Sequence, residues 1–496
     1  MRASRLSRRK LLSLGALAVA GAAVASCGAT PTTVQPTKAP AATAVRVATA
    51  EAEATSPAAT ATAVPTEVPV ATVAPAATAV PATKGATELN FWVCWGGIAV
   101  QTMQKLADSE EFAAFSPDTK VTVVEGKWTD AILPAIAAGE GFDAAACETY
   151  NELIARGAML PLTEQINASS NIPKDEYFDE AWIPITYKGE RYGVPAIEGW
   201  FRLALCYSKD MFKAEGLDPE KPPTTWEEVL ELHRKLTKFD DAGNVTQIGL
   251  DPYDGQGGWV DSNSPWVMPV TWGFEWFDPD TLKYMIDQPD MVEGWKNQTE
   301  FYTIAGPEKM GSFRQAFGGW TDPNGSFAKN LQAMQINGYW TPGELVNNAP
   351  DKKFGYSWLP VPAKVGAKKV HGVGTHAVII PTISKDREKA FKWAEFCISD
   401  TFCDAMFQAV GWLPPRTKYV QGVDAASKPG LEFFISTATD PDVTFAGCTF
   451  NPVESQTLDI WTKLRQEVYF DRITSEEGVS QMQEQCTAAL EEMMAG

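Results

Sequence analysis

The chain has 496 residues and a formal net charge of −20, with 45% hydrophobic and 21% charged residues. This composition is ordinary for a globular protein, and the length allows one large bilobed body or two domains. The acidic excess repels nucleic acid and anionic lipid, which excludes them as general partners. We therefore look for a neutral or cationic small ligand, although a local basic patch would still hold an anion.

The first 26 residues have the pattern of an export signal. Basic residues from Arg5 to Lys10 precede a run of small apolar residues, Leu11 to Ser26, which is too short and too weakly apolar to span a membrane. The two adjacent arginines resemble a twin-arginine signal. Val24 to Cys27 reads Val-Ala-Ser-Cys and resembles a bacterial lipobox, in which the cysteine is acylated and begins the mature chain. We expect residues 1–26 to be removed and Cys27 to hold the protein by a lipid anchor on the outer face of the cytoplasmic membrane.

Residues 27–86 have the composition of a disordered tether. From Gly28 to Ala86 the chain is mostly Ala, Thr, Pro and Val, without any Leu, Ile, Met or aromatic residue, so it lacks the side chains for a core. Its spaced prolines favour extended, polyproline-like segments. A glycosylated Thr/Pro stalk is a second use of the same composition and is compatible with the first.

The cysteines do not have the spacing of a metal or redox site. Apart from Cys27, seven of the eight cysteines are scattered through the body, so we expect neither a metal nor a cofactor. Cys94 and Cys147 each end a predicted strand. A disulfide between them is an alternative to the buried free thiols that we expect.

From Leu89 onward, short apolar strands alternate with helices, which predicts a mostly parallel α/β sheet. The predicted strands include Leu89–Cys94, Val121–Val124, Asp143–Cys147 and His376–Pro381. One helix is predicted over 127–139, with Thr129 as its cap and Gly139 as its stop.

Two further helices have capping signals. Thr225 and Glu228 form a capping box, and the apolar stripe that follows includes Trp226 and His233, which we assign to the core together with Trp393 of a later helix. Thr474 and Glu477 cap a final helix.

The order of several segments is more specific than any one of them. They are Tyr187–Pro195, Leu205–Phe212, Gly216–Pro223, Thr225–Glu228, Gln335–Trp340, Leu359–Pro362 and Gly411–Arg416. In this order the chain, from about Leu89 to its C-terminus, resembles the family 1 extracellular solute-binding proteins of ABC importers, the group that includes maltose-binding protein. The segment Gly139–Asp143 lacks the family's proline, and the third strand is followed by Cys-Glu-Thr-Tyr, so the sugar contacts of maltose-binding protein do not transfer to this lobe.

The resemblance implies a two-lobed, type II periplasmic-binding-protein-like α/β fold with three hinge crossings, near Ile197, Tyr356 and Ser436. The N-terminal lobe would comprise 87–197 and 356–435, and the C-terminal lobe 198–355 and 436–496. Closure of the lobes around a ligand is the expected motion. The implied partner is an ABC permease, and the protein would act as a monomer.

Sugars present apolar C–H faces ringed by hydroxyls, so a sugar site combines flat aromatic surfaces with a few polar groups. The chain has 17 tryptophans, several at predicted strand ends or in glycine-rich loops. The ligand-binding candidates are Trp95, Glu148, Tyr150, Glu198, Trp200, Trp266, Trp340, His376 and Trp412. Core packing is the alternative role for each.

The expected function is therefore capture of a mono- or oligosaccharide between the lobes and delivery to a permease. A polyol or a glycerophosphate ester is the alternative ligand. Two other classes of protein remain as alternatives. One is a secreted glycosidase that uses Glu148 and Glu198 as its carboxylate pair, and the other is a surface adhesin. The sequence has no nucleophile elbow, His-Glu-x-x-His motif or phosphate loop, and we expect no enzymatic activity.

Overall fold

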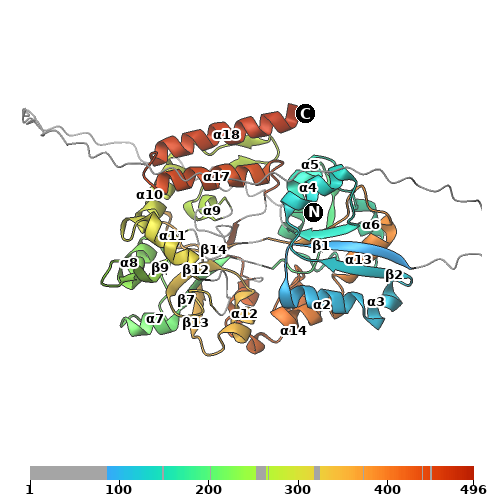
Figure 1. Ribbon diagram of the computed structural model, residues 1–496, viewed down its shortest axis with the longest axis horizontal. Coiled ribbons are helices and arrows are strands. Elements are labelled where there is room, and N and C mark those ends of the chain that lie inside the picture. The colour runs from blue at the N-terminus through green and yellow to red at the C-terminus, as the bar shows by residue number, and fades with distance from the viewer. Residues whose placement is uncertain are drawn as a thin grey trace, which may run out of the picture. The chain divides into compact units, whose positions relative to one another are not determined.

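The computed structural model describes residues 86–147, 150–200, 203–252, 264–265, 267–317, 324–372, 374–437, 440–446 and 449–495. The predicted export signal, Cys27 and the tether lie outside these residues. The described chain is built on two five-stranded sheets, each with its own helices (Figure 1).

The first sheet has the strand order β2-β1-β3-β15-β6. Its strands are β1 (Thr87–Val93), β2 (Thr119–Val124), β3 (Ala144–Cys147), β6 (Gly193–Pro195) and β15 (Ala377–Ile379). β1 pairs in parallel with β2 and β3, whereas β15 runs antiparallel to β3 and β6. The four predicted strands of this lobe are confirmed, with ends that differ by one or two residues.

Helices surround this sheet in Figure 1. They are α2 (Gly97–Ala107), α3 (Glu110–Phe115), α4 (Thr129–Ala138), α5 (Tyr150–Ala155), α6 (Thr163–Ala168), α13 (Arg387–Phe396), α14 (Asp400–Val410) and α15 (Thr417–Gln421). Gly139 ends α4 in the left-handed conformation, as predicted. The predicted cap is wrong by one residue, because Trp128 has the extended backbone of the cap and Thr129 is already helical. Trp393 is fully buried, edge-on to Phe91 and Phe112, which confirms its place in the core.

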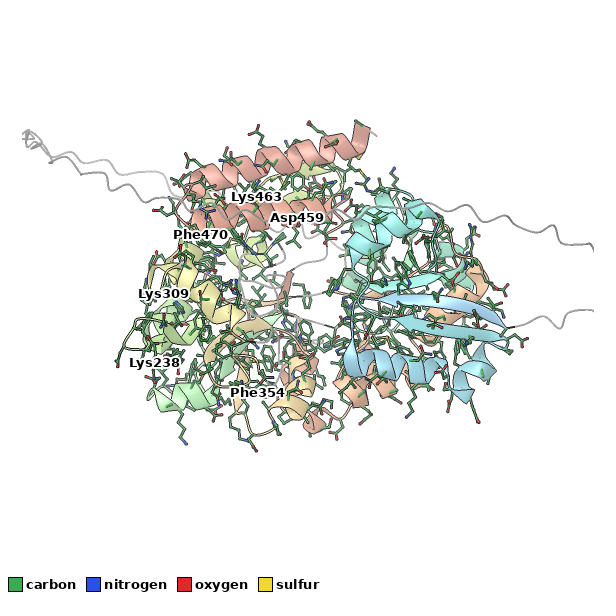
Figure 2. The ribbon with its side chains drawn as sticks, viewed as in Figure 1. Lys238, Lys309, Phe354, Asp459, Lys463 and Phe470 are labelled. Carbon is green, nitrogen blue, oxygen red and sulfur yellow. The ribbon has the colours of Figure 1, made fainter. Side chains whose placement is uncertain are left out.

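The second sheet has the order β13-β7-β12-β9-β8. Its strands are β7 (Ala204–Ser208), β8 (Lys238–Phe239), β9 (Val245–Leu250), β12 (Gln332–Asn337) and β13 (Phe354–Ser357). The remaining α-helices are α7 (Lys209–Ala214), α8 (Trp226–Leu236), α9 (Met268–Trp272), α10 (Pro289–Glu300), α11 (Pro307–Gln315), α12 (Thr341–Asn348), α16 (Leu431–Ser436), α17 (Glu454–Tyr469) and α18 (Ser475–Ala495). Figure 2 labels Asp459 and Lys463 on α17 and Phe354 at the start of β13.

Both predicted capping boxes are confirmed. The Thr225 hydroxyl accepts from the Glu228 N–H at 3.2 Å, and the Glu228 carboxylate accepts from the Thr225 N–H at 3.2 Å. Thr474 and Glu477 make the same reciprocal pair at 3.1 and 2.9 Å. Each pair satisfies N–H groups that a helix start otherwise leaves without partners.

The remaining elements are short. They are the hairpins β4 (Thr186–Tyr187) with β5 (Glu190–Arg191) and β10 (Phe277–Asp278) with β11 (Lys283–Tyr284), the parallel pair β14 (Lys369–Gly372) with β16 (Val443–Ala446), and the 3-10 turns η1 (Asp179–Ile185), η2 (Phe301–Thr303), η3 (Ala363–Val365) and η4 (Ala425–Ser427). No helix within the described ranges is long and apolar enough to cross a membrane.

The chain passes between the sheets in segments that lie side by side. The first passage joins β6 to β7, the second runs from β13 through β14 to β15, and the third leads through α16 and β16 to α17. β14 pairs with β16, and the Gly372 N–H donates to the Leu203 carbonyl at 2.9 Å, so the three passages are hydrogen-bonded to one another. Tyr356, near which a crossing was predicted, lies within β13 opposite Cys206. The position of this crossing stays a prediction.

Candidate functional site

Several predicted site residues meet at one edge of the first sheet. β1, β3 and β6 end at this edge and β15 begins there, since Ala377 pairs with both Cys147 and Pro195. Trp95 follows β1 after one residue, and His376 directly precedes β15. Ligands of open α/β sheets bind outside the carboxyl ends of the strands, so this edge is the candidate site.

Glu198 is the polar centre of this edge. Its carboxylate contacts Nδ1 of the His376 imidazole and accepts a hydrogen bond from the Tyr339 hydroxyl. The backbone aligns the first pair, because the His376 N–H donates to the Glu198 carbonyl at 3.1 Å. Glu198, His376 and Tyr339 are 4%, 3% and 0% exposed. Tyr339 follows β12 of the second sheet, so one buried carboxylate connects residues from both sheets.

The backbone around Glu198 is unusual. Ile197 has a φ of 71°, a left-handed conformation that is rare for a β-branched residue. Gly199 has a φ of 154°, and a Cβ at this position would lie 2.5 Å from the Thr375 hydroxyl. A strained backbone persists only where its surroundings fix it, and such positions cluster at ligand sites. Here the strained segment carries the Glu198 carboxylate between the two sheets.

Aromatic rings lie against this polar centre. The half-buried Trp95 ring is 4.7 Å from the His376 ring and almost perpendicular to it, and 4.9 Å from the Trp412 ring. The buried Trp340 lies beside Tyr339, with ring centres 5.5 Å apart. The structure thus brings together Trp95, Glu198, His376 and Trp412 in one cluster, with Trp340 next to it through Tyr339. Their role in ligand binding remains a prediction.

The other predicted residues lie elsewhere or outside the description. Trp200 is fully buried and its indole N–H donates to the Phe434 carbonyl at 3.0 Å. Tyr150 is buried at the start of α5, and its hydroxyl accepts from the Ala377 N–H at 3.1 Å. In this conformation both side chains support the edge from within the fold. Glu148 and Trp266 lie outside the described residues. The side chain of Cys147 also lies outside the description, so the alternative of a disulfide between Cys94 and Cys147 stays untested.

Tyr339 is a residue of this centre that the sequence did not predict. Tyr339 and Trp340 both follow the buried strand β12, and this position was the signal for either ring. The Trp340 ring lies close over Gly338, where an added Cβ would be 2.3 Å from it.

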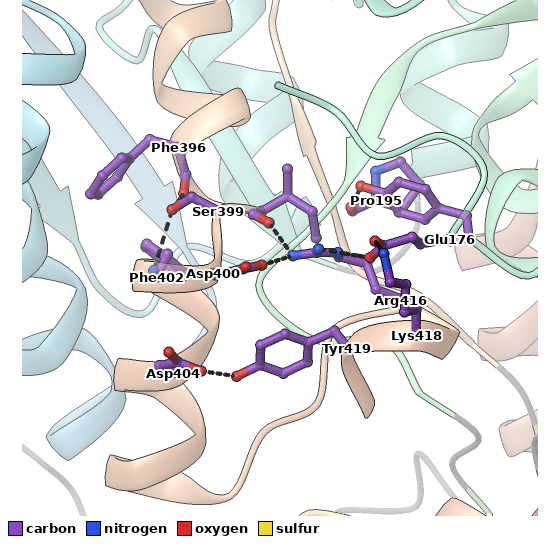
Figure 3. A network of polar contacts seen from close by, with 12 residues as sticks. Glu176, Pro195, Phe396, Ser399, Asp400, Phe402, Asp404, Arg416, Lys418 and Tyr419 are labelled. Atoms are coloured by element: carbon purple, nitrogen blue, oxygen red, sulfur yellow. Dashed lines mark hydrogen bonds and ion pairs between the residues drawn. The ribbon is translucent and has the colours of Figure 1, made fainter. Parts of the chain in front are cut away.

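The loop that carries Trp412 is fixed by Arg416. The Arg416 guanidinium donates to Asp400 at 2.6 Å, to the Ile398 carbonyl at 3.0 Å and to one Glu176 oxygen at 2.9 and 2.7 Å (Figure 3). Burial alone would lower the pKa of Arg416, but the hydrogen bonds that it donates to Asp400 and Glu176 raise this pKa overall. Arg416 therefore stays charged and ties the 411–416 loop to α14 and to residue 176.

Two histidines are buried away from this edge and stay neutral. Burial lowers the pKa of His233 and that of His371 to about 4 each. His233 is fully buried on α8, 2.9 Å from the Phe301 carbonyl, which confirms its predicted packing role. Within the described chain, no group of three or more His, Cys, Asp or Glu side chains is placed to hold a metal ion.

Two sheets joined by adjacent passages, with a polar and aromatic cluster at the strand ends, define a two-lobed α/β binding protein. The model of the bacterial extracellular solute-binding proteins matches residues 97–401, and the chain belongs to this family. The resemblance found in the sequence is thereby confirmed. The members of this family are binding proteins and not enzymes.

Two relatives among characterised proteins are sn-glycerol-3-phosphate-binding periplasmic proteins UgpB. The protein of Pectobacterium atrosepticum is 26% identical over 317 residues, which cover 60% of this chain and 64% of the relative. That of Salmonella typhimurium is 30% identical over 168 residues, 30% of this chain and 35% of the relative. The chain therefore spans less than two thirds of either relative's length.

Solved structures show the same fold. CpMnBP1 with mannotriose bound has a TM-score of 0.71 at 21% identity, covering 80% of this chain and 99% of its own. The solute-binding protein of Thermotoga lettingae bound with α-D-tagatose has a TM-score of 0.66 at 22% identity, covering 82% and 100%. The MalE domain of Bdellovibrio bacteriovorus bound to maltotriose has a TM-score of 0.65 at 18% identity, covering 82% and 100%. The expected two-lobed periplasmic-binding-protein fold is confirmed.

Proposed function

We propose that this protein is the substrate-binding component of an ABC importer, which holds a mono- or oligosaccharide between its lobes and delivers it to a permease without chemical change. The observation that carries the proposal is the cluster at the strand ends: Trp95 and Trp412 beside the buried Glu198 and His376. Indole faces accept the C–H faces of a sugar, and a carboxylate and an imidazole hydrogen-bond its hydroxyls.

The arrangement suits a protein that closes on its ligand. Glu198 contacts His376, which precedes a strand of the first sheet, and Tyr339, which follows a strand of the second. A ligand that binds at this carboxylate interacts with both lobes only when they are close, so binding favours the closed arrangement. The lobe boundaries and the three hinge crossings expected from the sequence belong to this proposal.

Export and anchoring complete the proposal. The family is extracellular, and the sequence carries a twin-arginine-like signal and a lipobox at Cys27. We expect Cys27→Ala to move the protein from the membrane fraction to the soluble exported fraction, and labelled fatty acid to be incorporated only into the unchanged chain. A monomer that is captured by its cognate permease in a pull-down supports the importer, whereas membrane anchoring without such capture would favour an adhesin.

A glycerophosphate ester is the second candidate ligand, because both UgpB relatives are named for sn-glycerol-3-phosphate. Lys428 adds a structural reason. It is 8% exposed, its ammonium lies 5.6 Å from the centre of the Phe407 ring, its methylene chain passes close to Gly411, the residue before Trp412, and within the described residues no carboxylate pairs with it. A phosphate near Trp412 would find a cation there.

Calorimetric titration of the purified protein separates these ligands. The panel is mannose, mannobiose, mannotriose, maltotriose, ribitol and sn-glycerol-3-phosphate. Binding of a neutral saccharide supports the first proposal, and binding of the phosphate ester alone, abolished by Lys428→Met, would replace it with the second. Incubation with the same oligosaccharides, followed by chromatography for shorter products, tests the absence of hydrolysis.

A further inference from the structure

Two loops lie next to each other at the ligand edge of the first sheet. β1 and β2 are parallel neighbours, so the loops that follow them leave the sheet at the same edge. The Lys127 N–H donates to the Val93 carbonyl at 2.9 Å, and the Gly126 N–H donates to the Trp95 carbonyl at 3.4 Å. We call Trp95, Glu125 and Trp128 of these loops the first-sheet lip.

Trp128 is the exposed member of the lip. Its side chain is 52% exposed, and that of Ile98, which follows Trp95 by three residues, is 54% exposed. Single exposed apolar residues are common on protein surfaces. Trp128 differs from them in its position, because its loop is hydrogen-bonded to Trp95, whose ring packs edge-on against His376 and at a tilt against Trp412. In the described structure no other ring or cation packs on its indole.

The Glu125 carboxylate lies near Gly96, the residue that follows Trp95. An added Cβ on Gly96, next to Trp95, would lie 3.3 Å from Oε2 of Glu125. Glu125 is exposed, and no cation of the described chain lies within ion-pair distance of it. An added Cβ on Gly97 or Gly126 meets nothing within 4 Å, so there is open space around both loops.

We propose that Glu125 and Trp128 of the first-sheet lip form a second sugar subsite, which binds a further unit of an oligosaccharide whose first unit lies at Trp95. The Trp128 indole stacks on the C–H face of the second unit, and the Glu125 carboxylate accepts hydrogen bonds from its hydroxyls. This inference rests on the proposed function and narrows it, since it selects oligosaccharides over monosaccharides. The unpaired negative charge of Glu125 also disfavours a phosphate at this position.

The test compares ligands of increasing length on four variants by calorimetric titration. The ligands are mannose, mannobiose and mannotriose, with glucose, maltose and maltotriose as a second series. We expect Trp128→Ala to weaken trisaccharide binding about five- to tenfold and to leave monosaccharide binding unchanged. Trp128→Phe retains most of the affinity, because a ring remains. Glu125→Gln weakens the trisaccharide severalfold.

Phe239→Ala is the matched control. Phe239 is 41% exposed in β8, the edge strand of the second sheet, next to Lys238, which Figure 2 labels. Its removal is expected to change no affinity. Melting curves verify that each variant is folded, and if Trp128→Ala fails this check, Trp128→Phe and Glu125→Gln decide the question.

The outcomes separate the inference from the proposed function. Unchanged trisaccharide binding by Trp128→Ala, an equal loss for mono- and trisaccharides, or a wild type that binds monosaccharides only, would each overturn the second subsite and leave the carbohydrate-binding proposal standing. A wild type that binds no saccharide of any length would overturn both.

Discussion

His233 links the stability of the second lobe to pH through its hydrogen bonds. Its Nε2 lies 2.9 Å from the Phe301 carbonyl, and its Nδ1 accepts from the Leu250 N–H at 3.0 Å. These partners require the neutral ring with its proton on Nε2, because a second proton on Nδ1 would face the Leu250 N–H. Burial, only partly opposed by the Phe301 carbonyl, accordingly lowers the pKa of His233 to about 4.

The sign of the effect follows from proton uptake. An unfolded histidine has a pKa of about 6.5, so between about pH 6.5 and about pH 4 the unfolded chain binds a proton that the folded chain does not. The free energy of unfolding therefore falls as the pH falls through this window. Between about pH 7.5 and about pH 5, a pKa difference of this size removes about 2 kcal/mol from the free energy of unfolding.

The assay is urea unfolding at these two pH values, followed by tryptophan fluorescence and circular dichroism, for the wild type and His233→Gln. The variant loses the bond from Leu250 and is expected to be less stable by about 1 to 3 kcal/mol near neutral pH. On acidification it should lose about 2 kcal/mol less than the wild type, since all other titrating groups are common to both. Equal losses in the two proteins would refute the reasoning.

Three further changes test the candidate site and its support. Trp95→Ala removes the half-buried ring that packs against His376 and Trp412. We expect the saccharide affinity, measured by calorimetry, to fall about tenfold or more with little change in Tm. An unchanged affinity would exclude Trp95 from the site. Tyr339→Phe removes the hydroxyl that donates to Glu198, which should lower the free energy of unfolding by about 1 to 3 kcal/mol and increase the ligand-free radius of gyration. Scattering curves that match those of the wild type would show that this hydrogen bond does not hold the lobes. Arg416→Met leaves the mostly buried Glu176 carboxylate without its main cation, and we expect a loss of about 3 to 5 kcal/mol in urea unfolding, with Arg416→Lys intermediate. A loss below about 1 kcal/mol would contradict the role given to this network.

Local signals in the sequence predicted much of the fold. Capping boxes depend on residues three apart, so Thr225 with Glu228 and Thr474 with Glu477 were readable without a structure. The side chain of Thr129 predicted that this residue caps α4. The extended backbone of the loop ends one residue earlier, so Trp128 is the cap residue. Strand ends were predicted to within one or two residues.

The site was predictable only in part. The rule that ligands bind at strand ends selected Trp95 and His376 correctly as residues of one edge. It did not reveal that Glu198 accepts from Tyr339, 141 residues away, because such a contact is made by the packing of the two sheets. Trp200 and Tyr150 follow the same rule, yet both side chains are buried in the fold, and the sequence does not distinguish a ring that supports the edge from one that faces a ligand.

The three chain passages between the sheets are hydrogen-bonded into one ribbon, through β14 with β16 and through Gly372 with Leu203. We expect the three passages to bend as one unit when the lobes close as proposed, because separating them would break the hydrogen bonds between β14 and β16 and between Gly372 and Leu203.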